Sequence, residues 1–157
     1  MFEMLFLLGF TLHNIEEALW LPKWSINAGK FHPHVKANEF HFAVICVTIA
    51  GYLITFQFMV IGANSKISEY VYFGFLLMMS MNSLFPHLIS AVITKKYAPG
   101  LLTGLLLNFP LGLYIVFCEY QQRITDVKLI ISFVTVTAVV LLSLKPLFRL
   151  GGRIIKY

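Results

Sequence analysis

Hydrophobic residues fill five long stretches of the chain, and short polar segments separate them. The stretches cover about residues 2–21, 40–62, 70–93, 100–118 and 129–148. A helix of about 20 apolar residues, rising 1.5 Å per residue, crosses the hydrocarbon core of a bilayer, which is about 30 Å thick. The pattern therefore predicts an all-α fold, a bundle of five transmembrane helices.

Proline and glycine set several of the predicted boundaries. Pro22 is predicted to end the first helix, and Pro99-Gly100 to precede the fourth. The one sizeable loop, Pro22–Glu39, contains Trp24 and lysines, which is typical of a segment at the membrane interface. The sequence shows no internal repeat and leaves no length for a separate soluble domain. Residues 1–157 are therefore predicted to form a single membrane domain.

Composition supports the membrane interpretation. The 157 residues are 59% hydrophobic and 12% charged, with a mean hydropathy of +0.81. An average soluble domain is roughly 25% charged, so this chain has too few charges to cover a core in water. The net charge of +5 suits basic cytoplasmic loops and does not indicate nucleic acid. Cys46 and Cys118 lie in apolar stretches and form no metal or redox motif.

The distribution of basic residues predicts an orientation. If the first loop is cytoplasmic, nine basic residues lie inside: Lys23, Lys30, Lys36, Lys95, Lys96, Lys145, Arg149, Arg153 and Lys156. Three then lie outside: Lys66, Arg123 and Lys128. Because Lys and Arg concentrate on the cytoplasmic side of membrane proteins, we expect the N-terminus outside and the C-terminus in the cytoplasm.

Polar residues inside the predicted helices gather at one depth. They are His13, Glu16 and Glu17 in the first helix, His41 at the start of the second, and Asn82 and His87 in the third. At 1.5 Å per residue, most of them lie within about 12 Å of the cytoplasmic end of their helix. The middle of the fifth helix holds only Ser and Thr as polar residues. The shared depth predicts one site, open toward the cytoplasm or its leaflet.

The first-helix cluster is the most informative part of that site. His13, Glu16 and Glu17 stand at i, i+3 and i+4, which places them on one helix face. An ionisable residue inside a membrane helix costs about 2.5–3.5 kcal/mol. Lys145 is the one Lys or Arg inside a predicted helix, and it is counted above among the cytoplasmic charges, so no basic residue is left within the membrane to offset that cost. A metal ion or shared protons must therefore do so, and histidine nitrogen and glutamate oxygen are ligands that zinc takes.

The stretch His13-Asn14-Ile15-Glu16-Glu17-Ala18-Leu19-Trp20-Leu21-Pro22 resembles the signature of the HXXEE domain family of small bacterial integral membrane proteins. The similarity continues with Asn82, His87, Tyr97-Ala98-Pro99-Gly100, Thr103 and Pro110. The resemblance implies a bacterial inner-membrane location and functional positions at His13, Glu16, Glu17 and His87, with Asn82 beside them. It implies no particular chemistry. His41 has no place in that pattern, and its role depends on depth alone.

Our first hypothesis is a membrane-embedded, metal-dependent enzyme, such as a hydrolase, that acts on a hydrophobic or lipid-like substrate from the cytoplasmic side. The candidate ligands of a divalent metal are His13, Glu16, Glu17, His87 and His41. Zinc is the first choice, with iron or manganese as alternatives. The candidate catalytic residues are Glu16, Glu17 and Asn82. One glutamate would bind the metal and the other would act as general base, and the sequence does not say which.

Two other functions stay open. A metal-free enzyme of the isomerase type could move protons with the same histidines and glutamates. A proton- or ion-coupled transporter could use them as a relay, although five helices without an inverted repeat argue against a monomeric carrier. The predicted partners are the lipid bilayer and an amphipathic small molecule, with no nucleic acid. Homo-oligomerisation is left open.

Overall fold

The computed structural model describes residues 1–28, 33–120 and 125–156, so Lys30 and Arg123 of the predicted charge pattern lie outside the described residues. Every element in the described part is helical: α1 (Phe2–Ser25), α2 (Ala37–Ile61), η2 (Gly62–Asn64), α3 (Lys66–Asn82), η3 (Ser83–Leu88), α4 (Ile89–Thr94), α5 (Leu101–Thr103), η4 (Gly104–Asn108), α6 (Phe109–Ile115), η5 (Val116–Tyr120) and α8 (Asp126–Ile154). Consecutive segments join into five helical rods. The predicted all-α, five-helix fold is confirmed.

Four of the five rods are long and apolar enough to cross a membrane, by length and composition. They are Ala37–Ile61, Lys66–Thr94, Leu101–Cys118 and Asp126–Ile154. The fifth rod, α1, has 24 residues and lies among the other four, but Glu16, Glu17 and Lys23 make it more polar. α1 is therefore not one of the four, although its 24 residues exceed the 18 of Leu101–Cys118.

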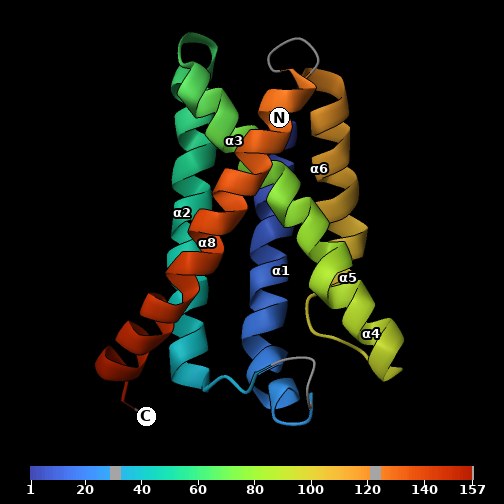
Figure 1. Ribbon diagram of the computed structural model, residues 1–157, viewed down its shortest axis with the longest axis vertical. Helices are drawn as coiled ribbons and strands as arrows, with labels where there is room; N and C mark the ends of the chain where they lie inside the picture. Colours follow the sequence, from blue (N-terminus) through green and yellow to red (C-terminus); the bar gives the residue numbers. More distant parts are fainter. Residues whose placement is uncertain (29–32, 121–124, 157) are drawn as a thin grey trace.

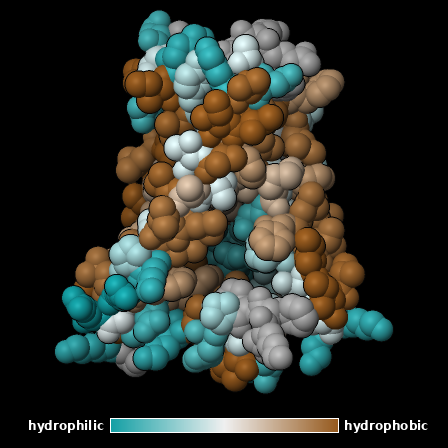
Figure 2. Space-filling model, in the orientation of Figure 1, coloured by the Kyte–Doolittle hydropathy of each residue, from teal (hydrophilic) through white to brown (hydrophobic). Residues whose placement is uncertain are grey.

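The rods run alternately up and down the bundle (Figure 1). The N-terminus lies near the upper end, whereas α1 and α4 end, and α2 and α5 begin, at the lower end, where the C-terminus also lies. The last helix, α8, crosses in front of α1 and packs on α2 and α3. Hydrophobic residues cover the middle of the face in Figure 2, and hydrophilic ones gather toward both ends. This distribution suits a protein that spans a bilayer.

Aromatic side chains fill the upper half of the bundle. Phe10 of α1 meets Phe75 of α3 edge to face at 5.3 Å, and Phe58 of α2 stacks on Tyr72 at 4.0 Å. The helices approach closely here, because a Cβ atom added to Gly51 would lie 2.5 Å from the Phe10 ring. The core above the predicted polar site is therefore apolar and closely packed.

The third rod is interrupted just before His87. Phe85 has extended backbone angles, with φ −127° and ψ 117°, inside the π-helical turn η3. Pro86 follows it, and a proline inside a helix removes one backbone hydrogen bond and clashes with the preceding turn. The direction of the His87 side chain is therefore set by this break and does not follow the periodicity of α3.

The prediction that Pro22 ends the first helix is wrong, since α1 continues through Pro22 to Ser25. Proline has no N–H group, so the carbonyl of Ala18 lacks its usual helical donor. The Nε2 atom of His41 lies 2.9 Å from that oxygen. Because a carbonyl oxygen only accepts, Nε2 of His41 carries the hydrogen. His41 thus replaces the hydrogen bond that Pro22 removes and joins α2 to α1.

Replacing His41 with alanine should lower the free energy of unfolding by about 1–3 kcal/mol, because the Ala18 carbonyl would lose its donor in an apolar setting. In the Pro22→Ala background the backbone N–H of residue 22 can bond to Ala18, so the same substitution should cost clearly less. Unfolding midpoints in detergent for the four proteins of this double-mutant cycle measure the difference. Equal costs in both backgrounds would contradict the role given to His41.

Candidate functional site

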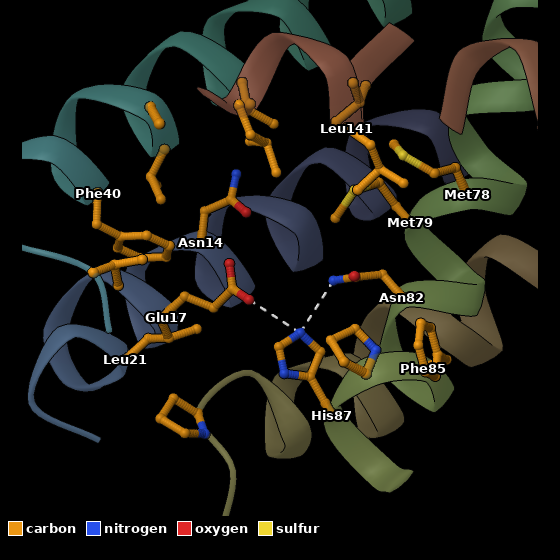
Figure 3. Close-up of a pocket in the computed structure, with 18 of the residues that line it drawn as sticks. Asn14, Glu17, Leu21, Phe40, Met78, Met79, Asn82, Phe85, His87 and Leu141 are labelled. Carbon is orange, nitrogen blue, oxygen red and sulfur yellow. Dashed lines mark hydrogen bonds and ion pairs between the residues drawn. The ribbon is translucent and has the colours of Figure 1, made fainter. Parts of the chain in front are cut away.

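Four polar side chains meet in the lower half of the bundle: His13 and Glu17 of α1, Asn82 at the end of α3, and His87 just after the helix break. Figure 3 shows Glu17, Asn82 and His87. Glu17 Oε1 lies 3.0 Å from His87 Nε2 and 3.8 Å from His13 Nε2. The Nδ2 atom of Asn82 lies 3.2 Å from His13 Nε2 and 3.1 Å from His87 Nε2. Two imidazole nitrogens, one carboxylate oxygen and one amide therefore converge on the same point.

Gly100 forms the wall behind the two histidines. Their rings lie 5.1 Å apart and nearly perpendicular, at 84°. A Cβ atom at Gly100 would lie 2.7 Å from Cε1 of His87 and 2.8 Å from Cε1 of His13. The φ angle of Gly100 is +90°, a conformation that residues with a side chain rarely adopt. Both the backbone and the space require glycine here, and its absence of a side chain lets the two rings approach.

His13, Glu17 and His87 have the geometry of a metal-ligand group. Among the described residues, one ligand atom from each of the three lies within 4.8 Å of the others. Tetrahedral zinc, with bonds of about 2.0–2.1 Å, holds its ligands roughly 3.3 Å apart, so small movements would suffice. Asn82 would have to rotate its amide away from the two nitrogens. Three protein ligands leave one position open, as in catalytic zinc sites.

Glu16 points away from this group and accepts four hydrogen bonds. Its Oε1 accepts from the Gly100 N–H at 2.7 Å and from the Tyr97 hydroxyl, and its Oε2 accepts from the Thr103 N–H at 3.0 Å and the Thr103 hydroxyl at 2.6 Å. These donors surround the start of α5, where the helix dipole and free N–H groups favour an anion. Glu16 thus caps the fourth rod in place of Gly100, which has no side chain.

Tyr97 contributes to this cap from the connection between α4 and α5, outside the membrane-spanning segments. Burial and the hydrogen bond to the Glu16 carboxylate raise the pKa of Tyr97 to about 12. The phenol therefore keeps its proton across the physiological range and acts as a permanent donor to Glu16.

Thr103 links Glu16 to His13. Its hydroxyl gives its hydrogen to Glu16, so the oxygen can only accept from Nδ1 of His13, 3.3 Å away. Nδ1 of His13 then carries the hydrogen, and Nε2, which faces Glu17 and Asn82, is left with a free lone pair. Histidine ligands in proteins are commonly oriented by such a hydrogen bond from the other ring nitrogen.

The structure therefore separates the predicted ligands. It brings His13, Glu17 and His87 together with Asn82, and it leaves Glu16 and His41 outside the group. Glu16 is outside because four donors already occupy its oxygens, and His41 because its Nε2 is bonded to Ala18. Adjacent glutamates on a helix point about 100° apart, which allows Glu16 and Glu17 to face different neighbours.

The sequence interpretation gave no role to the residues that hold Glu16, namely Tyr97, Gly100 and Thr103. Their signal was present, since all three belong to the motif that carries the family resemblance. The ion-pair partners of Glu17 in the described residues are histidines, in keeping with the expectation that no Lys or Arg neutralises the cluster.

A cavity of about 560 Å³ opens beside Glu17 and His87, between α1 behind and α8 in front. Figure 2 shows the molecular face hollowed in its lower half, with hydrophilic residues visible inside. Most of the wall is apolar, with contributions from Phe40 and Val47 of α2, Met79 of α3 and Leu144 of α8. The volume falls within the roughly 300–1,000 Å³ of pockets that hold small organic molecules.

This cavity is too large to be a packing defect. Its volume is many times that of the water-sized voids found in packed protein interiors. Apolar cavities do not hold water well. The apolar wall therefore suits an apolar molecule or a lipid tail.

Comparisons with known proteins agree with the resemblance seen in the sequence. The model of the family described as "Protein of unknown function with HXXEE motif" matches residues 4–115. The chain is also 45% identical to an uncharacterized protein of Bacillus subtilis (strain 168), YrkK, over 154 residues, which cover 98% of this chain and 97% of the relative. No solved structure matches the chain.

Removing the Thr103 hydroxyl should remove the hydrogen bond that fixes the tautomer of the His13 ring. In Thr103→Val, the neutral His13 ring should lose its fixed Nδ1–H form, and metal binding should weaken by about 10–100-fold, as is typical when such a hydrogen bond is lost. Thr103→Ser keeps the hydroxyl and should preserve both. Nitrogen NMR of ring-labelled histidine near pH 8, with His13→Asn to assign the signal, reports the tautomer. An unchanged His13 signal in Thr103→Val would contradict the link.

Proposed function

This chain belongs to the HXXEE family, and we propose that it is a membrane-embedded, metal-dependent enzyme acting on a hydrophobic or lipid-like substrate. The observation that carries the proposal is that Glu17 and His87 both meet His13 and line the cavity. A potential metal group that opens onto an apolar cavity inside a helical bundle is suited to chemistry on a molecule dissolved in the membrane.

In this proposal His13, Glu17 and His87 hold a divalent ion, with zinc favoured by the mixture of nitrogen and oxygen ligands. When bound, the ion supplies a Lewis acid that polarises a carbonyl or phosphoryl oxygen and promotes hydrolysis. Thr103 keeps Nε2 of His13 available, and Gly100 leaves room for both rings. Asn82 can turn its amide toward a polar group in the cavity.

The contacts of the two glutamates support a choice between them, which the sequence left open. Glu16 is fully engaged with the start of α5, so Glu17 is the carboxylate that reaches both the histidines and the cavity. We therefore propose that Glu17 binds the ion through Oε1 and exchanges protons with the bound molecule through its second oxygen, and that Glu16 has a positioning role. Glu16 acts through Thr103 on His13 and touches no molecule in the cavity.

A metal-free proton-transfer enzyme is our second candidate, favoured by the direct contact between Glu17 and His87 at 3.0 Å. A carboxylate and an imidazole at this distance can share a proton and pass it to a substrate. A transporter is less well supported, because among the described residues a cluster of aromatic side chains packs above the site.

The metal proposal predicts the composition of the purified protein. Wild-type protein prepared without chelators should contain about one divalent ion per chain, measured by mass spectrometry of the elements. Glu17→Gln and His87→Ala should each remove the ion, because each removes one of three ligands. His34→Ala, which alters an exposed histidine, is the matched control and should keep it.

Folding of each variant is checked by circular dichroism and gel filtration. Folded wild-type protein that holds no metal after incubation with zinc, iron or manganese would rule out the metal centre. The proton-transfer candidate would then take its place.

We also propose a bacterial inner-membrane location, with the lower end of the bundle in the cytoplasm. After replacement of Cys46 and Cys118, Asn27→Cys at the lower end should react with an impermeant thiol reagent only once the membrane is disrupted. Asn64→Cys at the upper end should react in intact cells. The reverse pattern would invert the proposed topology.

A further inference from the structure

The polar groups of the cavity lie partway along its length. Glu17 stands eight residues above the end of α1 and His87 seven residues above the end of α4, which is about 10–12 Å. The wall continues below them to Trp24, one residue from the end of α1. It continues above them to Met78, four residues and about 6 Å before Asn82 on α3. The candidate reaction site is therefore not at either end of the cavity.

Both ends of the cavity are apolar. Figure 3 shows Leu21 and Phe40 on one side of the Glu17–His87 pair, and Met78 and Met79 on the other. Asn14 and Asn82 complete the polar belt, and Ser90 and Thr137 are the other hydroxyl or amide residues among the described lining. A molecule that fills this cavity meets polar groups near its middle and hydrocarbon on both sides.

The cavity opens sideways at the depth of the membrane. Phe85 and Leu141 line it and are 69% and 61% exposed on the outer surface. Leu141 lies near the middle of α8, fifteen residues after Asp126 and thirteen before Ile154. A rim of exposed apolar side chains at mid-span faces lipid tails, so an apolar molecule can move between the bilayer and the cavity without crossing water.

We propose that the substrate carries an ester linkage inside an otherwise hydrocarbon molecule, with apolar chain on both sides of it, and that it moves sideways from the bilayer between η3 and α8. This inference rests on the proposed function, since it takes Glu17 and His87 as the reacting site. An internal ester places its carbonyl beside the polar belt and its two chains in the two apolar ends.

The alternatives fit the cavity less well. A molecule with a terminal carboxylate or phosphate would place that head beside the polar belt and its chain in one apolar end, and would leave the other end unfilled. A plain alkane would leave the Asn82 amide without a partner from the ligand. The lining of α8 extends from Phe133 to Phe148, about 22 Å, which exceeds the roughly 15 Å that one lipid tail spans in a bilayer leaflet.

Trp24 provides a reporter because it lines the cavity and Trp20 is the one other tryptophan in the sequence. The Trp20→Phe protein, in nanodiscs of unbrominated lipid, is titrated with three probes. They are dibrominated stearic acid esterified with decanol, the free dibrominated acid, and a dibrominated alkane of matched length. The ester should quench Trp24 saturably, with half-saturation at about tenfold lower concentration than the acid or the alkane.

Larger side chains in the cavity wall should abolish the preference for the ester over the acid and the alkane. Val140→Phe from α8 and Val47→Phe from α2 both narrow it, and each should raise the half-saturation for the ester by about tenfold. Val139→Phe is the matched control, since Val139 is 62% exposed outside the cavity, and it should change nothing. Two filling variants from different helices keep the test valid if one of them does not fold.

Two outcomes would overturn the proposal: acid that binds as tightly as ester, or ester quenching that survives both filling variants. Metal content is measured on the same samples. Absence of metal with a retained ester preference would refute the metal centre and leave the substrate class standing, so the two failures are distinguishable.

Discussion

The carboxylate of Glu16 and the start of α5 hold the lower half of this protein together. Burying a glutamate at this depth costs free energy unless its charge is stabilised. Here two backbone N–H groups, a threonine hydroxyl and a tyrosine hydroxyl donate hydrogen bonds to it. The same contact satisfies donors that every helix leaves free at its N-terminus. It also brings Gly100 against the rings of His13 and His87. The join between α1 and the fourth rod thus holds a residue without a side chain at the place where the two rings approach each other.

This arrangement also determines the contacts of Glu17. Since Glu16 takes the donors of the helix start, Glu17 is left to the histidines and the cavity. Two adjacent residues of the same type thus perform different tasks: one binds an element of the fold, and the other faces a ligand space. The division explains why a motif with two glutamates need not contain two catalytic carboxylates.

The depth of polar residues was enough to predict that His13, Glu17, Asn82 and His87 share a site, because helices of known direction fix height along the bundle. Depth says nothing about rotation around each helix axis. For that reason the sequence grouped Glu16 and His41 with the ligands, whereas the packing of α5 and α2 turns both toward backbone partners. Likewise, Pro22 indicated a helix end because the sequence shows that this residue has no N–H group. The sequence does not show that His41, on another helix, supplies the hydrogen bond instead.

We favour an enzyme over a carrier in our proposal because of the position of the cavity more than because of the chemistry of its residues. A carrier needs polar surface, or a gap between repeats, that extends to both faces of the membrane. Here the polar belt has hydrocarbon walls on either side of it, and above those walls Phe10, Phe75 and Tyr72 close the bundle. The opening between Phe85 and Leu141 leads to lipid. A molecule can therefore reach Glu17 and leave again by the same side of the protein, which suits a reaction and does not suit passage.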